Sequence, residues 1–232
     1  MAASLPPNVH ISTHPCLRAK LSQLRSASTS SKETNALVHD ITLILGCEAL
    51  AKNVEVSKSG TDKTPLGYEY SIETLSPSKI SLIPILRSGL GMIQATQALL
   101  PTSVPVHHLG LFREPTTLQP VEYYNNLPSP SPSASTPSST KPSTLAILLD
   151  PIIATGGTAA AAIQTLREWG VEKVLMISVL GSVEGVRRAA EEWGEGVEIW
   201  IGAVDEGGLD GKGMIVPGLG DVGDRLFLAA GK

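Results

Sequence analysis

The stretch 145-LAILLDPIIATGGTAAAAI-163 decides the fold of this chain. Its first five residues are apolar, as in a buried strand, and its last residues are rich in alanine, the strongest helix former. Between them lies a short loop that begins at Asp150 and ends with Thr155-Gly156-Gly157-Thr158. A strand that leads through a loop into a helix predicts the α/β class, with the loop at the helix N-terminus.

The loop from Asp150 to Thr158 has the chemistry of a phosphate site. A helix N-terminus leaves backbone N–H groups without acceptors, and glycines let an anion approach the main chain. Ionised Asp150 only accepts hydrogen bonds, so it suits sugar hydroxyls or a metal. The loop favours a phosphorylated sugar as ligand, although a Gly-Gly turn is also common between a strand and a helix that bind nothing. It lacks the lysine of a Walker A loop, which disfavours a nucleotide triphosphatase.

Three segments together carry a specific resemblance. The run 149-LDPIIATGGT-158 resembles the phosphoribosyl pyrophosphate (PRPP) loop of the uracil phosphoribosyltransferases. The runs 84-PILRSGLGM-92 and 215-IVPGLGDVGDR-225 resemble the same family, in the same order. The similarity extends from about His14 to Phe227, which is nearly the whole chain.

This resemblance implies a type I phosphoribosyltransferase-like fold. We expect a central, mostly parallel sheet flanked by helices, with N-terminal helices and a small C-terminal hood that binds the base. The segment 113–124 resembles the family's flexible β-arm. We expect one domain over residues 1–232, in which the Pro/Ser-rich tract 127–143 is a flexible insertion.

The resemblance also implies an activity, namely transfer of the 5-phosphoribosyl group from PRPP to uracil, which gives UMP and pyrophosphate. It implies catalytic roles for Asp221, Arg87 and Asp150. The residues that it implies for PRPP binding are Arg87, Arg113, Asp150, Pro151, Ile152, Ile153, Ala154, Thr155, Gly156, Gly157, Thr158 and Asp221. Those implied for uracil binding are Ile215, Gly220, Asp221 and Val222.

Within this set, residues 155–158 are expected at the 5-phosphate and Asp150 at the ribose hydroxyls. Arg87 and Arg113 are expected at the pyrophosphate. The implied cofactor is Mg²⁺, held mainly by PRPP and water, because Pro151 follows Asp150 where many phosphoribosyltransferases place a second acidic residue. The family further suggests GTP as a candidate activator and a homodimer or homotetramer.

Rival functions find less support in the residues. A non-catalytic regulator that senses uracil, UMP or PRPP would be favoured by loss of Arg87, Asp150 or Asp221, and all three are present. The segment 215–225 argues against a purine as the base. The pattern G-x-G-x-x-G from Gly218 to Gly223 is followed by nine residues, too few for a dinucleotide-binding βαβ unit.

Composition sets outer bounds on the function. Hydrophobic residues make up 42% of the 232 positions and charged residues 17%, as in a compact globular protein. The net charge of −4 disfavours nucleic acid as the main partner. No apolar run approaches the roughly 20 residues that span a bilayer, and the two cysteines are too few for a disulfide framework. We therefore expect a cytoplasmic protein that acts without a membrane.

Hydrophobic periodicity predicts the remaining elements, while the first dozen residues look loosely structured. The expected helices are 17–24, 32–50, 91–100, 159–169 and 183–193. The expected strands are 80–86, 104–112, 173–180 and 197–204, with a hairpin within 53–76. Two departures from the family stand out: Ser88 replaces the more frequent alanine, and the segment 205–209 carries an extra residue beside Gly207-Gly208.

Overall fold

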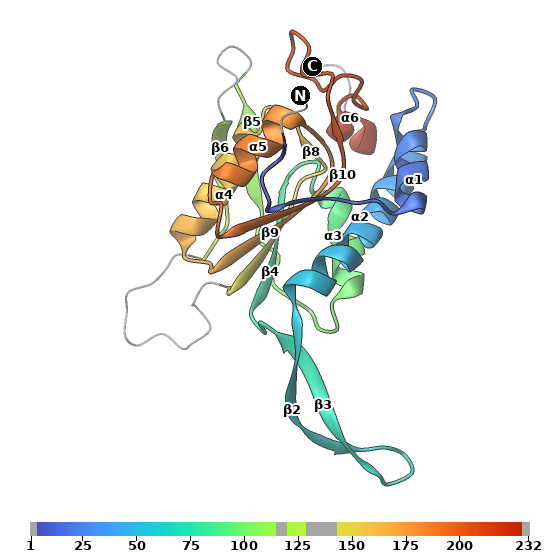
Figure 1. Ribbon diagram of the computed structural model, residues 1–232, viewed down its shortest axis with the longest axis vertical. Coiled ribbons are helices and arrows are strands. Elements are labelled where there is room, and N and C mark those ends of the chain that lie inside the picture. Colours follow the sequence, from blue (N-terminus) through green and yellow to red (C-terminus); the bar gives the residue numbers. More distant parts are fainter. Residues whose placement is uncertain (1–3, 115–119, 129–142, 229–232) are drawn as a thin grey trace.

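The computed structural model describes residues 4–114, 120–128 and 143–228 (Figure 1). Its helices are α1 (Pro15–Arg25), α2 (Ser31–Asn53), α3 (Leu90–Leu99), α4 (Gly157–Trp169), α5 (Val183–Glu191) and α6 (Val222–Phe227). Its strands are β1 (Val9–Ile11), β2 (Glu55–Lys63), β3 (Glu69–Ser76), β4 (Ile80–Leu86), β5 (Leu109–Arg113), β6 (Pro120–Asn125), β7 (Leu145–Leu149), β8 (Ile152–Ile153), β9 (Lys173–Ser182) and β10 (Val197–Asp205).

The central sheet confirms the predicted α/β class. Its strand order is β1-β10-β9-β7-β4-β5-β6, and β8 also pairs with β9. These pairs are parallel, except that β6 runs antiparallel to β5. All five residues of β7 are buried, as expected for a central strand covered on both faces.

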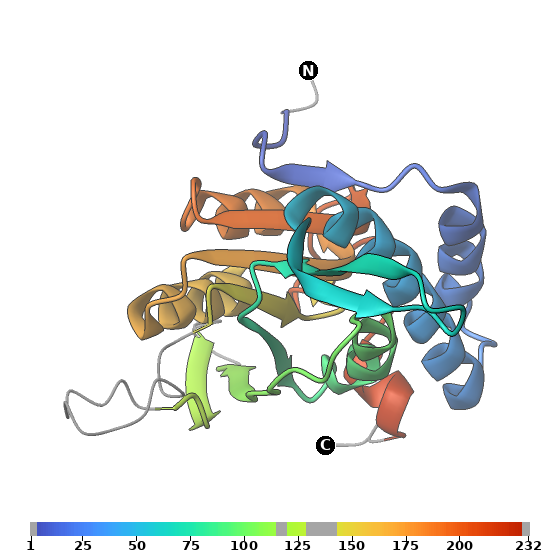
Figure 2. The ribbon, with the colours of Figure 1, turned by 90° about the horizontal axis from the view of Figure 1, so that it is seen from below.

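Helices cover both faces of the sheet (Figure 2). Alternate residues of β7 serve the two faces: Ile147 and Leu149 pack with the apolar residues of α1, α2 and α3. Ala146 and Leu148 pack with those of α4 and α5. Because β4, β7, β9 and β10 run parallel, their carboxyl ends lie at one edge of the sheet, where open α/β sheets bind ligands.

The N-terminal helices begin as their sequences direct. Pro15 is the first residue of α1, a position at which its missing N–H costs nothing. Before α2, the Ser30 hydroxyl accepts from the Glu33 N–H, and the Glu33 carboxylate accepts from the Ser30 N–H at 2.8 Å. This capping box starts α2 at Ser31, one residue before the predicted start.

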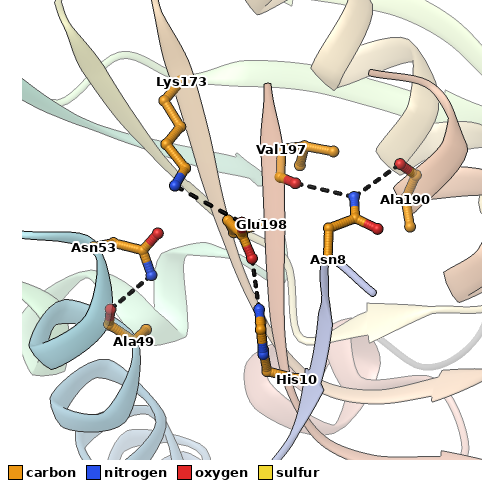
Figure 3. A network of polar contacts seen from close by, with 8 residues as sticks. All are labelled: Asn8, His10, Ala49, Asn53, Lys173, Ala190, Val197 and Glu198. Atoms are coloured by element: carbon orange, nitrogen blue, oxygen red, sulfur yellow. Dashed lines mark hydrogen bonds and ion pairs between the residues drawn. The ribbon is translucent and has the colours of Figure 1, made fainter. Parts of the chain in front are cut away.

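The prediction of a loosely structured N-terminus was wrong, because β1 lies parallel to β10 at the edge of the sheet. The Asn8 side chain donates to the carbonyl oxygens of Ala190 and Val197, both at 3.0 Å (Figure 3). His10 Nε2 lies 2.5 Å from Glu198 Oε2, and its ring stacks on Trp200. A three-residue strand has little periodicity of its own, so these distant partners hold it.

The strand predicted at 104–112 is present, but it begins five residues later, at Leu109. Pro105 lacks an N–H, and this segment contributes an isolated bridge between Val106 and Leu82 before β5 begins at Leu109. His107 therefore precedes the strand instead of lying within it, and its ring meets the edge of Trp169. The pKa of His107 lies below its ordinary value, mainly because the ring is partly buried and to a smaller extent because His108 lies close by.

One hairpin extends from the body of the protein, and a second antiparallel pair ends the central sheet. The predicted hairpin consists of β2 and β3, which pair antiparallel and reach away from the sheet (Figure 1). The predicted β-arm at 113–124 corresponds to the β5–β6 pair, although residues 115–119 lie outside the described residues. Most of the Pro/Ser tract, 129–142, also lies outside them. In the described ranges, no helix is long and apolar enough to cross a membrane.

Candidate active site

The loop after β7 takes the shape that its sequence predicts. Gly156 has a φ of 74°, which a residue with a side chain rarely adopts, and α4 begins at the next residue. A Cβ on Gly156 would lie 2.3 Å from the Gly185 carbonyl oxygen, so this glycine also permits a close approach to α5. The Ser182 hydroxyl donates to the Ala154 carbonyl at 2.6 Å and fixes the loop against the end of β9. The first turn of α4 is thereby presented as an anion site.

The corner after β4 supplies a cation and a hydroxyl. The Arg87 side chain is 55% exposed, and its Nη2 lies 3.3 Å from Asp224 Oδ1. This contact uses one of the five N–H groups of the guanidinium. The Ser88 hydroxyl donates to Asp150 Oδ1 at 3.2 Å and so joins the ends of two neighbouring strands.

Asp150 is a buried carboxyl group with few partners. It is 6% exposed, and burial raises its pKa to about 7, while hydrogen bonds from the Ser88 side chain and the Ile152 backbone act in the opposite direction. A group with such a pKa changes charge near neutrality. This perturbation is common at functional sites.

The C-terminal loop faces the phosphate loop across the carboxyl edge of the sheet. Gly218 and Gly220 have φ values of 62° and 79°, and a Cβ on Gly218 would lie 2.1 Å from the Ile215 carbonyl oxygen. Asp221 follows as the N-cap of α6, where its carboxylate accepts from the Asp224 N–H at 3.0 Å. The loop therefore exposes backbone beside a fixed carboxylate.

Two arginines anchor this loop, which sequence reasoning did not anticipate. Arg25 from α1 forms a bidentate pair with Asp205 at 2.6 and 2.8 Å, and also donates to the Gly218 carbonyl at 2.7 Å. Arg225 donates to the carbonyl oxygens of Leu24, Leu219 and Ser26 at 2.6, 2.7 and 3.0 Å. Asp205 ends β10 as expected, but its role in this structure is to hold the loop.

One cavity of about 360 Å³ connects these segments. The predicted residues that line it are Arg87, Asp150, Ile152, Ile153, Ala154, Thr155, Gly156, Thr158, Ile215, Gly220, Asp221 and Val222. Pro151 and Gly157 lie behind this lining: the Pro151 carbonyl accepts from the backbone of β9, and Gly157 faces Arg188. The backbone of Arg113 ends β5, and its side chain is outside what the structure describes.

Other residues of the lining were not predicted. They include Phe112, Tyr123, Met214 and Leu219. Phe112 and Tyr123 are paired rings, 6.1 Å apart, on the two strands of the β-arm. Phe112 directly precedes Arg113 and Tyr123 lies within the predicted arm, and this placement was the available signal, since apolar side chains that remain exposed on a hairpin often serve a site.

Asp205→Asn is expected to lower the free energy of unfolding by about 2–3 kcal/mol at pH 7, because it removes the charge that faces Arg25. Burial raises the pKa of Asp205, but hydrogen bonds from Arg25 and the Gly218 N–H outweigh it, so the pKa lies below its ordinary value. The stabilisation is therefore present above the unfolded-state pKa of about 4 and is lost as the pH falls through the folded-state pKa.

Thermal unfolding of both proteins between pH 7 and pH 3 measures this. The variant should unfold about 5–10 °C lower at pH 7, and the difference should shrink toward pH 3. Equal melting temperatures at pH 7 would show that Asp205 is not an anchor.

The fold is that of the type I phosphoribosyltransferases: a mostly parallel sheet of this topology, a Gly-Gly loop at a helix N-terminus and a separate C-terminal loop that lines the same cavity. The adenine phosphoribosyltransferase of Trypanosoma brucei, at 18% identity, shares the fold with a TM-score of 0.53 over 89% of this chain and 87% of its own.

Closer relatives identify the family. The model of the family described as uracil phosphoribosyltransferase matches residues 11–229, so the chain belongs to the uracil phosphoribosyltransferase family. The uracil phosphoribosyltransferase of Roseiflexus castenholzii is 41% identical over 219 residues, which cover 94% of this chain and 97% of that protein. The AQ2163 protein of Aquifex aeolicus superposes with a TM-score of 0.82 at 31% identity, over 95% and 98% of the two chains.

Proposed function

We propose that this protein transfers the 5-phosphoribosyl group of PRPP to uracil and releases UMP and pyrophosphate. The observation that carries the proposal is that one cavity is lined by Asp150, the loop 154–156, Arg87 and residues 213–215 and 219–223 of the C-terminal loop. It joins an anion site, an acceptor for sugar hydroxyls and an exposed backbone that suits a flat base. The names of the relatives support the same activity.

In this proposal each wall of the cavity takes one part of the substrates. The first turn of α4, with Thr155 and Thr158, binds the 5-phosphate through N–H and hydroxyl donors. Asp150 accepts from the ribose hydroxyls. Arg87 binds the pyrophosphate and exchanges its contact with Asp224 for phosphate oxygens, which form stronger charge-assisted hydrogen bonds. Arg113, Pro151 and Gly157 remain predicted contributors, the last two through the loop backbone.

The C-terminal loop is proposed to select uracil. The base presents alternating carbonyl acceptors and N–H donors along one edge, which main-chain groups near Gly220 and Val222 can match. Ile215 is buried beside them and supplies an apolar contact. Cytosine would turn an amino group toward a backbone donor, and an unpaired buried donor costs about 1–3 kcal/mol.

The chemistry needs positioning and charge but no protein nucleophile. As pyrophosphate departs, the anomeric carbon gains positive character, so the site must hold both substrates and stabilise separated charges. Asp221 follows the glycine of the base loop and faces the same cavity as the phosphate loop. We assign it the role of linking the base to the sugar and of favouring the positive charge that develops there.

The donor set fits an Mg²⁺ ion that arrives with PRPP. Among the described residues, no group of three or more His, Cys, Asp or Glu side chains is placed to hold a metal. Mg²⁺ keeps several waters and binds substrate phosphates, so we expect PRPP and water to hold it, while Asp150 accepts from the ribose hydroxyls. When bound, the ion would neutralise charge on the pyrophosphate.

The test is formation of labelled UMP from radiolabelled uracil, PRPP and Mg²⁺, with cytosine, hypoxanthine and adenine in parallel reactions. Product from uracil alone supports the proposal. No product with any base, together with calorimetric binding of PRPP, would favour the non-catalytic regulator. Product from a purine would overturn the assignment of the C-terminal loop.

Four further expectations remain predictions. Repeating the assay with GTP tests activation, and light scattering tests the homodimer or homotetramer. The exposed hairpin formed by β2 and β3 offers Val56, Leu66 and Tyr68 as apolar surface for such an association.

A cytoplasmic location is tested by fractionation. A single domain over 1–232, with 127–143 as an insertion, is tested by one cooperative unfolding transition and by early proteolysis within the tract.

A further inference from the structure

The Ser88 hydroxyl is placed to act on Asp150. Its oxygen lies 3.2 Å from Asp150 Oδ1, and both residues line the cavity. An ionised carboxylate offers about four lone-pair sites. Ser88 and the Ile152 N–H occupy two of them, which leaves two for the two hydroxyls of a ribose ring.

The backbones on both sides of this contact are fixed. On the β4 side, the Gly89 N–H donates to the Ile85 carbonyl at 2.9 Å, and a Cβ on Gly89 would lie 2.3 Å from the Leu149 carbonyl oxygen. On the β7 side, the Ser178 hydroxyl donates to the Asp150 carbonyl at 2.7 Å. Main-chain packing therefore fixes the two backbones from which the Ser88 hydroxyl and the Asp150 carboxylate meet.

The surroundings of Asp150 make this donor consequential. Burial favours the neutral acid, so the pKa of Asp150 is raised to about 7, whereas the Ser88 hydrogen bond favours the ionised form. Within the described chain, the other charged or titratable side chains that line the cavity are Arg87, Tyr123 and Asp221. Arg87 is paired with Asp224, and Asp221 caps α6. The groups that oppose the effect of burial on the pKa of Asp150 are thus two neutral donors, the Ser88 hydroxyl and the Ile152 N–H.

We propose that Ser88 is a positioning residue: its hydroxyl donates to the Asp150 carboxylate and orients it as an acceptor for the ribose hydroxyls of PRPP. The proposal rests on the function proposed above. Ser88→Ala removes the donor, and Ser88→Thr keeps it.

The first measurement is the pH dependence of kcat/KM for PRPP, which reports groups that titrate in the free enzyme. In Ser88→Ala the acid limb should move upward by about half a unit to one unit, because one hydrogen bond to a charged group is lost. At pH 6 this is a loss of about 3- to 10-fold, and the curves should converge near pH 9. Ser88→Thr should follow the wild type. Ionisation of PRPP itself is common to all three proteins and cancels.

The second measurement is independent of turnover. The carboxyl carbon of Asp150, assigned in labelled protein by its loss in Asp150→Asn, is titrated by NMR in wild type and Ser88→Ala. An upward shift in the alanine variant supports the proposal even if uracil proves not to be a substrate, in which case the proposed function alone fails. An unchanged titration of Asp150, or an acid limb that does not move, would overturn the role of Ser88.

Discussion

Asp221→Asn is expected to lower kcat by about a hundredfold or more while the fold is retained. The substitution removes a negative charge from the cavity, at the proposed junction of the base and phosphoribosyl sites, and preorganised charges typically contribute about 10²–10³ to turnover. Asparagine is as good an N-cap as aspartate, so it can still accept from the Asp224 N–H and start α6. Steady-state kinetics with uracil and PRPP, together with the melting temperature, measure both effects.

Asp40→Asn is the matched control. Asp40 pairs with Lys20 on the surface, away from the cavity, and exposed pairs of this kind contribute less than about 1 kcal/mol. It should leave kcat and the melting temperature close to wild type. If Asp221→Asn turned over uracil as fast as this control, Asp221 would have no catalytic role.

Gly156→Ala should abolish measurable PRPP binding, which corresponds to an affinity loss of at least about 100-fold. A residue with a Cβ pays about 1–2 kcal/mol for a left-handed backbone. The new methyl group would also lie 2.3 Å from a backbone oxygen of Gly185, so the loop has to move. Isothermal calorimetry with PRPP at a fixed Mg²⁺ concentration measures the loss.

The neighbouring Gly157→Ala provides a sharp comparison. Its added Cβ would meet the end of the Arg188 side chain at 3.3 Å, a flexible neighbour that can shift, and the position is already helical. We expect PRPP affinity within a few-fold of wild type. Equal losses in the two variants would mean that the loop tolerates no side chain at all, and the backbone argument for Gly156 would then be wrong.

Much of this architecture is encoded locally, which is why the sequence predicts it. The strand, the Gly-Gly turn and the alanine-rich helix at 145–163 are neighbours in the chain, so period and turn chemistry suffice. The same holds for Leu17, Leu21 and Leu24, which all lie buried on α1. The three motifs then predicted which loops meet, because strand ends in a parallel sheet share one edge.

Contacts between distant segments could not be predicted in this way. The pairing of Arg25 with Asp205 joins residues 180 positions apart, and nothing near either one signals the other. Ser88 and Asp150 are 62 positions apart, and at the sequence level Ser88 was a departure from the family without a partner. Short edge strands such as β1 could not be predicted for a related reason: they are stabilised by pairing with a distant strand, here β10.

The anchoring of the C-terminal loop has a consequence for altering the enzyme. Its glycines and Asp221 are tethered to α1 and to the turn after it by Arg25 and Arg225, through carbonyl oxygens that exist whatever the side chains are. The phosphate loop is held separately, by β9 and α5. In the proposed function, the loop for the base and the loop for the sugar phosphate are therefore anchored to different elements, and we expect substitutions at residues 213–216, made in a search for new nucleobase substrates, to leave the anchoring of the phosphate loop unchanged.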